Sequence, residues 1–532
     1  MNKNSREENS YQVWLKTFAI ALLAISIFFR FANIDKKAYS YDETHTSLRV
    51  SGYTFNEIFE DFQDDKISTI EDLQKYQQLS PEKSGLGTIK GLIEEEPQHP
   101  PLYFLLLRIW GRLYGDSVES IRTFSALVSL LAFPAIYWLS LELFDSSLVG
   151  WISVLLLATS PFHVLYAQEA RQYSLWTVGI LLSSAVFLKA LRKRNKLYWQ
   201  LYAIALSASF YTFPFTVFVT IGHGLYVICI NGFRVTRSVF SYFISALVGF
   251  LSFSPWLIIV ALNYSTVKDS TPWATQDVGI KVLLKGWSFY FSSIFYDTNI
   301  DWFSSCNTRW WQYLPIFVVL PLIVFSIYFL LRYASKSSLF ILFLIGTTFA
   351  FLALPDIILG GRRSLMARYL IPSFLGVELA VAYLFASKLK FVSLRHSNHM
   401  GWQAALVILV SIGILSCTVS YHADNWWNKY NDPLPEVARI VNNTESPMFV
   451  AESDFSGTLI ALSHRIKPDV KVHFTLPSNT LKVPEDIKNI FLLGPPYQGE
   501  LLAQFAETDK LVQQVDASWC VPTWGGLWKI SL

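Results

Sequence analysis

Two adjacent carboxylates, Asp42 and Glu43, are the residues of this chain best placed to do chemistry. They lie just beyond an apolar run over residues 13–31, which is long enough to cross a bilayer as a helix of ~20 residues. An ionised carboxylate at that water-facing rim can take a proton from an incoming nucleophile. Helix capping or simple solvation of a loop is the alternative explanation. Asp42 and Glu43 are therefore candidate catalytic residues.

Two histidines could join these carboxylates in a metal site. His45 follows Asp42 closely, and His99 lies at the far end of the same polar segment. Imidazole is a common metal ligand, but single histidines more often serve as plain hydrogen-bonding residues. The sequence therefore names His45 and His99 as candidate ligands of a divalent metal, does not indicate that a metal is bound, and assigns no other cofactor.

A second polar cluster joins two apolar runs at residues 160–173. It contains Glu169, Arg171 and Tyr173 at membrane depth, where ionisable groups are costly and usually face a cavity or each other. An internal Glu169–Arg171 ion pair would be a purely structural explanation. The functional alternative is that Arg171 helps to position an anionic group.

A third cluster, at residues 360–372, places arginines on the predicted outer side, against the usual bias of basic residues toward the cytoplasm. Either the predicted topology is wrong there, or the arginines face a bound anion. Arginine suits phosphate because its planar fork donates two hydrogen bonds at once. Arg363 and Arg368, with Arg171, are therefore candidate ligands of a phosphate, and a phosphate beside an external carboxylate suggests a lipid-phosphate substrate.

The composition sets the class of protein that must position these residues. Of 532 residues, 52% are hydrophobic and only 16% are charged, against ~25% charged in an average soluble domain. The mean hydropathy is +0.35. The net charge of +3 is too small to argue for a nucleic-acid partner. The chain is expected to be a polytopic α-helical membrane protein.

Apolar runs predict about eleven transmembrane helices. After the first run they cover residues 118–144, 147–165, 172–191, 198–213, 214–231, 238–262, 313–332, 337–355, 368–388 and 402–421. Basic clusters fall on one side of this arrangement if the segment from His99 begins a short interfacial helix. The first loop, residues 33–99, and the C-terminus are then non-cytoplasmic, in the inner or plasma membrane of the cell.

The tail, residues 422–532, differs from the membrane part, residues 1–421. Alternating helices and strands predict a small external α/β domain. The expected helices are Pro435–Asn442, Ser456–His464 and Glu500–Glu507, and the expected strands are Met448–Glu452, Val470–Phe474, Ile487–Leu493, Leu511–Val515 and Leu527–Ser531. Four cysteines form no scaffold, and whether Cys306 and Cys520 pair stays open.

Taken together, four motifs resemble those of the GT-C membrane glycosyltransferases, specifically relatives of protein O-mannosyltransferases and of the lipid A aminoarabinose transferase. The motifs are Asp42-Glu43, His99-Pro100-Pro101-Leu102-Tyr103, Glu169-Ala170-Arg171-Gln172-Tyr173, and Arg368-Tyr369 with Pro372. The resemblance covers about residues 10–420. One departure is Gln98-His99, where the aminoarabinose enzyme has Glu-Lys, so the expected carboxylate is missing and a metal site and an aminosugar donor are both in doubt.

The resemblance implies a GT-C fold and transfer of a sugar, with inversion, from a polyprenyl-phosphate donor to a lipid, glycan or protein acceptor on the non-cytoplasmic face. It implies that Asp42 is the catalytic base and that His99, Glu169, Tyr173 and Tyr369 contact substrate. The alternatives are a lipid-linked sugar flippase or transporter, and an O-antigen ligase-like oligosaccharide transferase. A transporter should carry polar residues near midspan, whereas the ionisable residues here gather at external helix ends.

Overall fold

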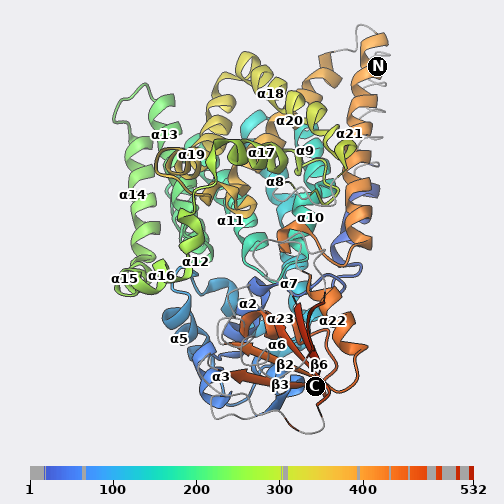
Figure 1. Cartoon of the computed structure of the whole chain (residues 1–532). Helices are drawn as coiled ribbons and strands as arrows, with labels where there is room; N and C mark the ends of the chain where they lie inside the picture. Colours follow the sequence, from blue (N-terminus) through green and yellow to red (C-terminus); the bar gives the residue numbers. More distant parts are fainter. Residues whose placement is uncertain are drawn as a thin grey trace.

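The computed structural model describes residue 17 and residues 20–62, 67–300, 302, 309–391, 396–429, 433–452, 456–475, 484, 487–493, 511–515 and 527–531. A helical bundle occupies most of the molecule, and a small sheet with its helices lies at one end of it (Figure 1). Residues 41–114 form short helices between these two parts: α2 (Tyr41–Ser51), α3 (Phe55–Phe62), α4 (Ile70–Gln74), η1 (Lys75–Gln77), α5 (Gly85–Glu95) and α6 (Leu102–Tyr114).

All the apolar runs predicted from the sequence fold as helices. The first run contains the helix Ile20–Phe31. The bundle then comprises α7 (Val118–Leu130), α8 (Ala132–Phe144), α9 (Ser147–Thr159), α10 (Pro161–Ala167), α11 (Tyr173–Lys193), α12 (Lys196–Thr212), α13 (Thr216–Ile230), α14 (Arg237–Ser252), α15 (Ser254–Leu262), α16 (Tyr264–Ser270), η2 (Pro272–Thr275), α17 (Gly279–Ser292), η3 (Trp310–Tyr313), α18 (Ile316–Tyr333), α19 (Ser335–Leu359), η4 (Arg363–Leu365), η5 (Ala367–Leu370), α20 (Ile371–Phe391) and α21 (His396–His422).

The number of membrane crossings stays a prediction. Among the described residues, 6 helices are long and apolar enough to span a bilayer, or up to 8 if two bent pairs each count as one span. Shorter apolar helices cover Ile20–Phe31 and Thr216–Ile230. The polytopic helical class is confirmed, whereas the count of eleven is not tested by length and hydropathy alone.

A proline bends one of these spans at the point where the polar turn begins. Helices α9 and α10 meet at 61° around Ser160. Ser160 has an extended backbone (φ −66°, ψ 115°), as expected before Pro161, whose ring clashes with a preceding helical residue. The sequence reasoning treated 147–165 as one straight helix. The bend turns α10 so that it leads into residues 168–172, which reach the functional residues.

The tail forms a mixed sheet with the strand order β1-β3-β2-β4-β6-β5. Its elements are η7 (Trp427–Lys429), α22 (Leu434–Asn442), β2 (Pro447–Glu452), α23 (Ser456–Leu462), β3 (Lys471–Thr475), β4 (Asn489–Leu493), β5 (Leu511–Gln514) and β6 (Leu527–Ser531). The predicted α/β order is confirmed for these elements. The helix expected at Glu500–Glu507 lies outside the described residues, as do Cys306 and Cys520.

The first loop contributes to the core of the tail domain, which the sequence did not indicate. Strand β1 (Ser68–Thr69) pairs antiparallel with β3, at the edge of the sheet. Loop residues Leu48, Ile58 and Phe62 share one buried apolar cluster with Phe449 and other tail residues. Because α2 takes part in this cluster, the tail domain is packed directly against the helix that carries Asp42 and Glu43.

The segment that enters the tail is anchored by two tryptophans. The indole N–H groups of Trp426 and Trp427 donate to Oδ2 of buried Asp297 at 2.9 and 2.6 Å. Burial raises the pKa of the Asp297 carboxyl to about 6, although the two indole bonds favour its ionised form. This anchor fixes the path of the following residues, Asn428 and Lys429.

Candidate active site

Helix α2 begins with a reciprocal capping arrangement that fixes the two carboxylates. The Glu43 N–H donates to Ser40 Oγ at 3.3 Å, and the Ser40 N–H donates to Glu43 Oε2 at 3.0 Å. Such a capping box satisfies two of the N–H groups left unpaired at a helix start. Asp42 and Glu43 therefore lie in the first turn, where the helix dipole favours negative charge.

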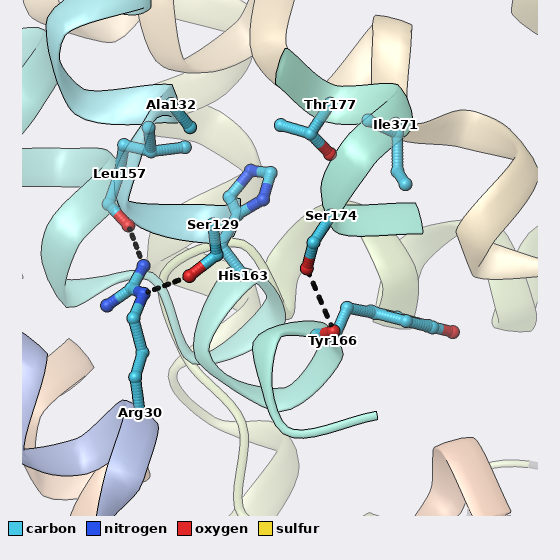
Figure 2. Close-up of a pocket in the computed structure, with 9 residues that line it drawn as sticks. All are labelled: Arg30, Ser129, Ala132, Leu157, His163, Tyr166, Ser174, Thr177 and Ile371. Atoms are coloured by element: carbon cyan, nitrogen blue, oxygen red, sulfur yellow. Dashed lines mark hydrogen bonds between the residues drawn. The ribbon is translucent and has the colours of Figure 1, made fainter. Parts of the chain in front are cut away.

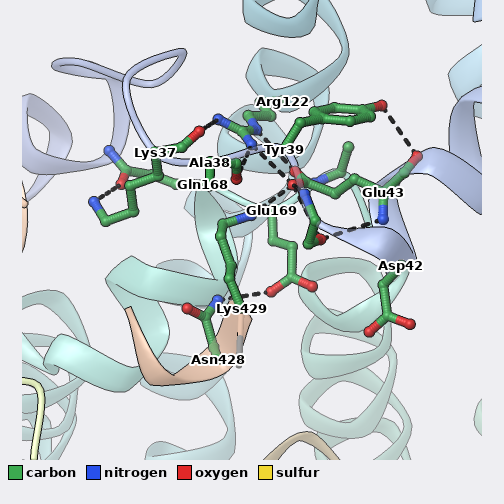
Figure 3. A network of polar contacts seen from close by, with 12 residues as sticks. Lys37, Ala38, Tyr39, Asp42, Glu43, Arg122, Gln168, Glu169, Asn428 and Lys429 are labelled. Carbon is green, nitrogen blue, oxygen red and sulfur yellow. Dashed lines mark hydrogen bonds and ion pairs between the residues drawn. The ribbon is translucent and has the colours of Figure 1, made fainter. Parts of the chain in front are cut away.

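Glu43 is a fully buried junction between three distant parts of the chain (Figure 3). The Arg122 guanidinium donates to both of its oxygens at 2.8 Å, through Nε and Nη2. Lys429 Nζ donates to Oε2 at 2.5 Å, and the Ala170 N–H donates to Oε1 at 3.0 Å. Together with Ser40, these donors engage both carboxylate oxygens.

The electrostatics of Glu43 follow from those partners. Burial by itself raises the pKa of the carboxyl, but Arg122 and Lys429 outweigh it and hold the pKa well below its ordinary value. Burial lowers the pKa of the Lys429 ammonium, against the attraction of Glu43. A carboxylate held this tightly is a poor proton acceptor, so the geometry favours a structural task for Glu43.

Asp42, by contrast, faces the groups that sequence reasoning assigned to substrate. Its Oδ2 accepts from Arg368 Nη1 at 2.5 Å, and its side chain is 18% exposed. Burial raises the pKa of the carboxyl, but the Arg368 and Arg171 guanidiniums bring it below its ordinary value. Asp42 is therefore ionised at neutral pH and partly open to its surroundings.

Arg171 lies on the backbone side of Asp42 and links it to His99. Its Nη1 donates to the Asp42 carbonyl at 3.0 Å and to Thr46 Oγ1 at 3.1 Å. Its Nη2 lies 3.2 Å from His99 Nε2, and Gln172 lies 3.1 Å from His99 Nδ1. Burial lowers the pKa of His99 to about 3. Arginine is a donor only, so Nε2 of the neutral imidazole accepts from Arg171.

A carboxylate that the sequence analysis missed lies between the two candidate metal ligands. Glu96 Oε2 is 3.2 Å from His45 Nδ1, and Glu96 Oε1 is 3.8 Å from His99 Nε2. Arg49 Nε also donates to Glu96 Oε2 at 3.1 Å. Among the described residues, no group of three or more His, Cys, Asp or Glu side chains is arranged to hold a metal ion. His99 is thus hydrogen-bonded and His45 lies within ion-pair range of Glu96, and the metal role of both stays a prediction.

Glu169 is buried on the opposite side of this cluster. Its Oε2 accepts from Asn428 Nδ2 at 2.9 Å, whereas Oε1 has no hydrogen-bond partner in the described part of the chain. Burial raises the pKa of Glu169, the nearby Lys429 ammonium opposes this rise, and Glu43 and Asp42 add to it. The Arg171 guanidinium instead bonds to the Asp42 carbonyl, Thr46 and His99. Among the described contacts, Glu169 and Arg171 therefore do not form the structural ion pair considered from the sequence.

Aromatic rings complete the surroundings of Arg368. The guanidinium carbon lies 5.5 Å from the Tyr173 ring centre and 5.7 Å from that of Tyr369, within the range of cation–π attraction. The Tyr369 ring in turn contacts Phe215 at 4.9 Å between centroids. Tyr173 and Tyr369 therefore lie beside the Asp42–Arg368 pair, and their contact with a substrate stays a prediction.

Arg363 has a different environment from Arg368. Its Nη1 lies 3.0 Å from Asp356 Oδ1, and it also donates to the Gly360 carbonyl at 3.3 Å. This contact closes the loop at the end of α19. Two of the three arginines predicted at a phosphate thus have a protein carboxylate as counter-ion: Asp356 for Arg363 and Asp42 for Arg368.

A small cavity lies deeper in the bundle and contains neither Asp42 nor Arg368 (Figure 2). Arg30 lines it and donates to Ser129 Oγ at 3.2 Å and to the Leu157 carbonyl at 3.3 Å. His163 also lines it, 3.4 Å from Glu378 Oε2 in the middle of α20. The sequence predicted that ionisable residues gather at external helix ends, and the buried His163–Glu378 pair is a contact it did not predict.

Sequence reasoning missed four residues of the site: Glu96, Arg122, Asn428 and Lys429. Arg122 could have been identified from the sequence, because a charged arginine just inside a predicted transmembrane helix is costly and predicts a buried partner. Glu96 was hidden within the acidic run 94–96. Nothing local distinguishes Asn428 or Lys429, since only the folded tail brings them to Glu169 and Glu43.

Comparison with known proteins gives a match over residues 98–259 to the family described as dolichyl-phosphate-mannose-protein mannosyltransferase. The whole chain has a fold similar to that of ArnT from Cupriavidus metallidurans bound to undecaprenyl phosphate: the TM-score is 0.50, the identity is 12%, and the alignment covers 97% of this chain and 98% of that chain. The apo ArnT structure gives a TM-score of 0.49 at 12% identity, with the same coverage. No curated protein sequence matches the chain.

The family match covers the segment that contains His99, Arg122, Glu169, Arg171 and Tyr173. At 12% identity the structural likeness shows the fold alone. The structural likeness confirms the predicted GT-C fold, and the family match shows that residues 98–259 are similar to the dolichyl-phosphate-mannose-protein mannosyltransferases.

Proposed function

We propose that this relative of the GT-C membrane glycosyltransferases transfers a hexose or pentose from a polyprenyl-phosphate donor to a lipid, glycan or protein acceptor. Transfer inverts the anomeric carbon and takes place on the non-cytoplasmic face of the membrane. Support comes from the mannosyltransferase family match over residues 98–259 and from the ArnT-like fold, since that ArnT structure is bound to undecaprenyl phosphate.

The single observation that carries the proposal is the pairing of Asp42 with Arg368. These residues are 326 positions apart, and their side chains meet at 2.5 Å next to Tyr173 and Tyr369. A general base and a phosphate-binding cation must belong to one site for this reaction, because in an inverting transfer the attacking group and the leaving phosphate lie on opposite faces of the same carbon.

In the proposed step, Asp42 accepts the proton of an acceptor hydroxyl as its oxygen attacks the anomeric carbon. The bond from that carbon to the phosphate oxygen breaks, and polyprenyl phosphate leaves with the electron pair. Arg368 stabilises the charge that develops on the phosphate. An incoming phosphate also weakens the hold of Arg368 on Asp42, which raises the pKa of Asp42 toward its ordinary value and makes it a better base.

The remaining candidates take supporting roles in this proposal. Arg171 and Glu43 hold the start of α2, which fixes the position of Asp42. Arg171 can also add positive potential at the donor phosphate. Arg363 anchors its own loop through Asp356 and does not need a bound anion.

The test is to incubate the purified, lipid-reconstituted protein with polyprenyl-phosphate monosaccharides and to measure release of polyprenyl phosphate. Wild-type protein should release it in the presence of an acceptor, and Asp42→Asn should lower the rate by ~10²–10⁴ because the amide keeps the shape but accepts no proton. Movement of intact donor across the membrane without release would instead identify a flippase. Wild-type turnover by Asp42→Asn would reject Asp42 as the base.

A further inference from the structure

The linker into the C-terminal domain enters the candidate active site. Directly after the Trp426–Trp427 anchor, Asn428 donates to Glu169 and Lys429 donates to Glu43. Both side chains are buried, at 5% and 2% relative exposure. The two contacts join positions 259 and 386 residues apart in sequence, so the tail reaches back to both acidic residues.

Glu169 is held in a one-sided way. Asn428 engages Oε2 at 2.9 Å, and Oε1 is buried with no hydrogen-bond partner among the described residues. In Figure 3 the Glu169 carboxylate lies between Asn428 and the side chain of Asp42. A buried carboxylate oxygen without a donor is costly, and such an atom beside a reaction centre indicates a donor that arrives with the ligand.

The charges that face Glu169 come from four elements. Lys429 of η7 makes the largest favourable contribution, Arg368 of η5 adds to it, and Glu43 and Asp42 of α2 oppose it. From α10, Tyr166 also lies within its electrostatic reach. Of these groups, Lys429 belongs to the tail, as does Asn428, so the tail supplies both the largest favourable charge on Glu169 and its hydrogen bond.

We propose that Asn428 and Lys429 are positioning residues that keep Glu169 ionised, with Oε1 directed at a hydroxyl of the sugar bound beside Asp42. The C-terminal domain is then a working part of the active site. This inference rests on the proposed glycosyltransferase function and adds the source of a sugar contact to it.

The expected signature is a shift in pH dependence. Burial raises the pKa of Glu169, and Lys429 acts against this rise. Removal of either the ammonium or the amide donor should raise that pKa further, so the ionised form is lost at a higher pH. Loss of the free energy of one hydrogen bond to a charged group should move the acidic limb of the activity profile upward by about one pH unit.

The experiment compares pH profiles of kcat and KM for release of polyprenyl phosphate from polyprenyl-phosphate mannose, with acceptor present, in full-length Asn428→Leu and Lys429→Met. Lys467→Met is the matched control, because Lys467 is an exposed tail lysine that donates to the Asn442 carbonyl. Each protein is assayed below its own melting temperature. The same substitutions are repeated in a Glu169→Gln background, where Glu169 cannot titrate.

The expected result is an upward shift of the acidic limb in both linker variants, no shift in the control, and no further shift in the Glu169→Gln background. If the acidic limbs of both linker variants stayed at the wild-type pH while kcat fell equally at every pH, the inference would be overturned and the linker would be a structural anchor only. A shift that persists without Glu169 would also overturn it. If wild-type protein released no polyprenyl phosphate from this or any other polyprenyl-phosphate sugar, the proposed function would be rejected instead.

Discussion

Replacement of Glu43 by glutamine separates the structural task of Glu43 from the proposed chemistry of Asp42. The amide keeps the shape of the side chain but removes the only carboxylate that touches both Arg122 and Lys429 in the described structure. Its NH₂ group must also face one of these donors. Loss of one partner of a buried ion pair costs ~3–5 kcal/mol, and two cations share this partner.

The pH dependence of stability gives the sign of the effect. The pKa of Glu43 is lower in the folded protein than its ordinary value of 4.5, so its contribution is fully present above that value and is lost as the pH falls toward the folded-state pKa. Wild-type protein should therefore lose melting temperature on acidification. The Glu43→Gln variant should have a lower melting temperature than wild type at neutral pH, and that temperature should fall less on acidification.

The assay is thermal melting of reconstituted protein from about pH 4 to about pH 8, beside turnover. Asp42→Asn is the companion variant. The Asp42 side chain is 18% exposed, so loss of its negative charge should reduce turnover far more than stability. If Glu43→Gln melts like wild type at neutral pH but has lost turnover, Glu43 acts in the chemistry and the structural assignment is refuted.

Three further outcomes are expected. Arg368→Ala should weaken undecaprenyl phosphate binding by ~10–100-fold, or ~1.5–3 kcal/mol, whereas Arg363→Ala should leave it unchanged in the same titration; equal losses would contradict the separation. A membrane-impermeant maleimide should label Lys467→Cys in intact cells, with the wild-type chain as background; labelling only after lysis would reverse the topology. Gly457→Ala should lower the melting temperature, because its Cβ would lie 2.4 Å from Tyr41 Cε2, and a second change, Tyr41→Ala, should restore it.

Patterns within short stretches of sequence predicted the helical class, the positions of the apolar helices and most elements of the tail. Each of these depends on local composition or periodicity, which a single chain displays directly. The Asp42 position was also predictable, since an acidic pair just beyond an apolar run is visible without any tertiary contact.

Only the tertiary structure decided how the charges are paired. Asp42 and Glu43 are neighbours in sequence, but the first helical turn directs one toward Arg368 and the other toward Arg122 and Lys429. Likewise, Arg363 and Arg368 are close in sequence, but Arg363 pairs with Asp356 and Arg368 pairs with Asp42. Pairing of buried charges depends on which distant segments meet in space. Desolvation makes each such meeting strongly favourable or strongly unfavourable, and no local pattern in the chain encodes it.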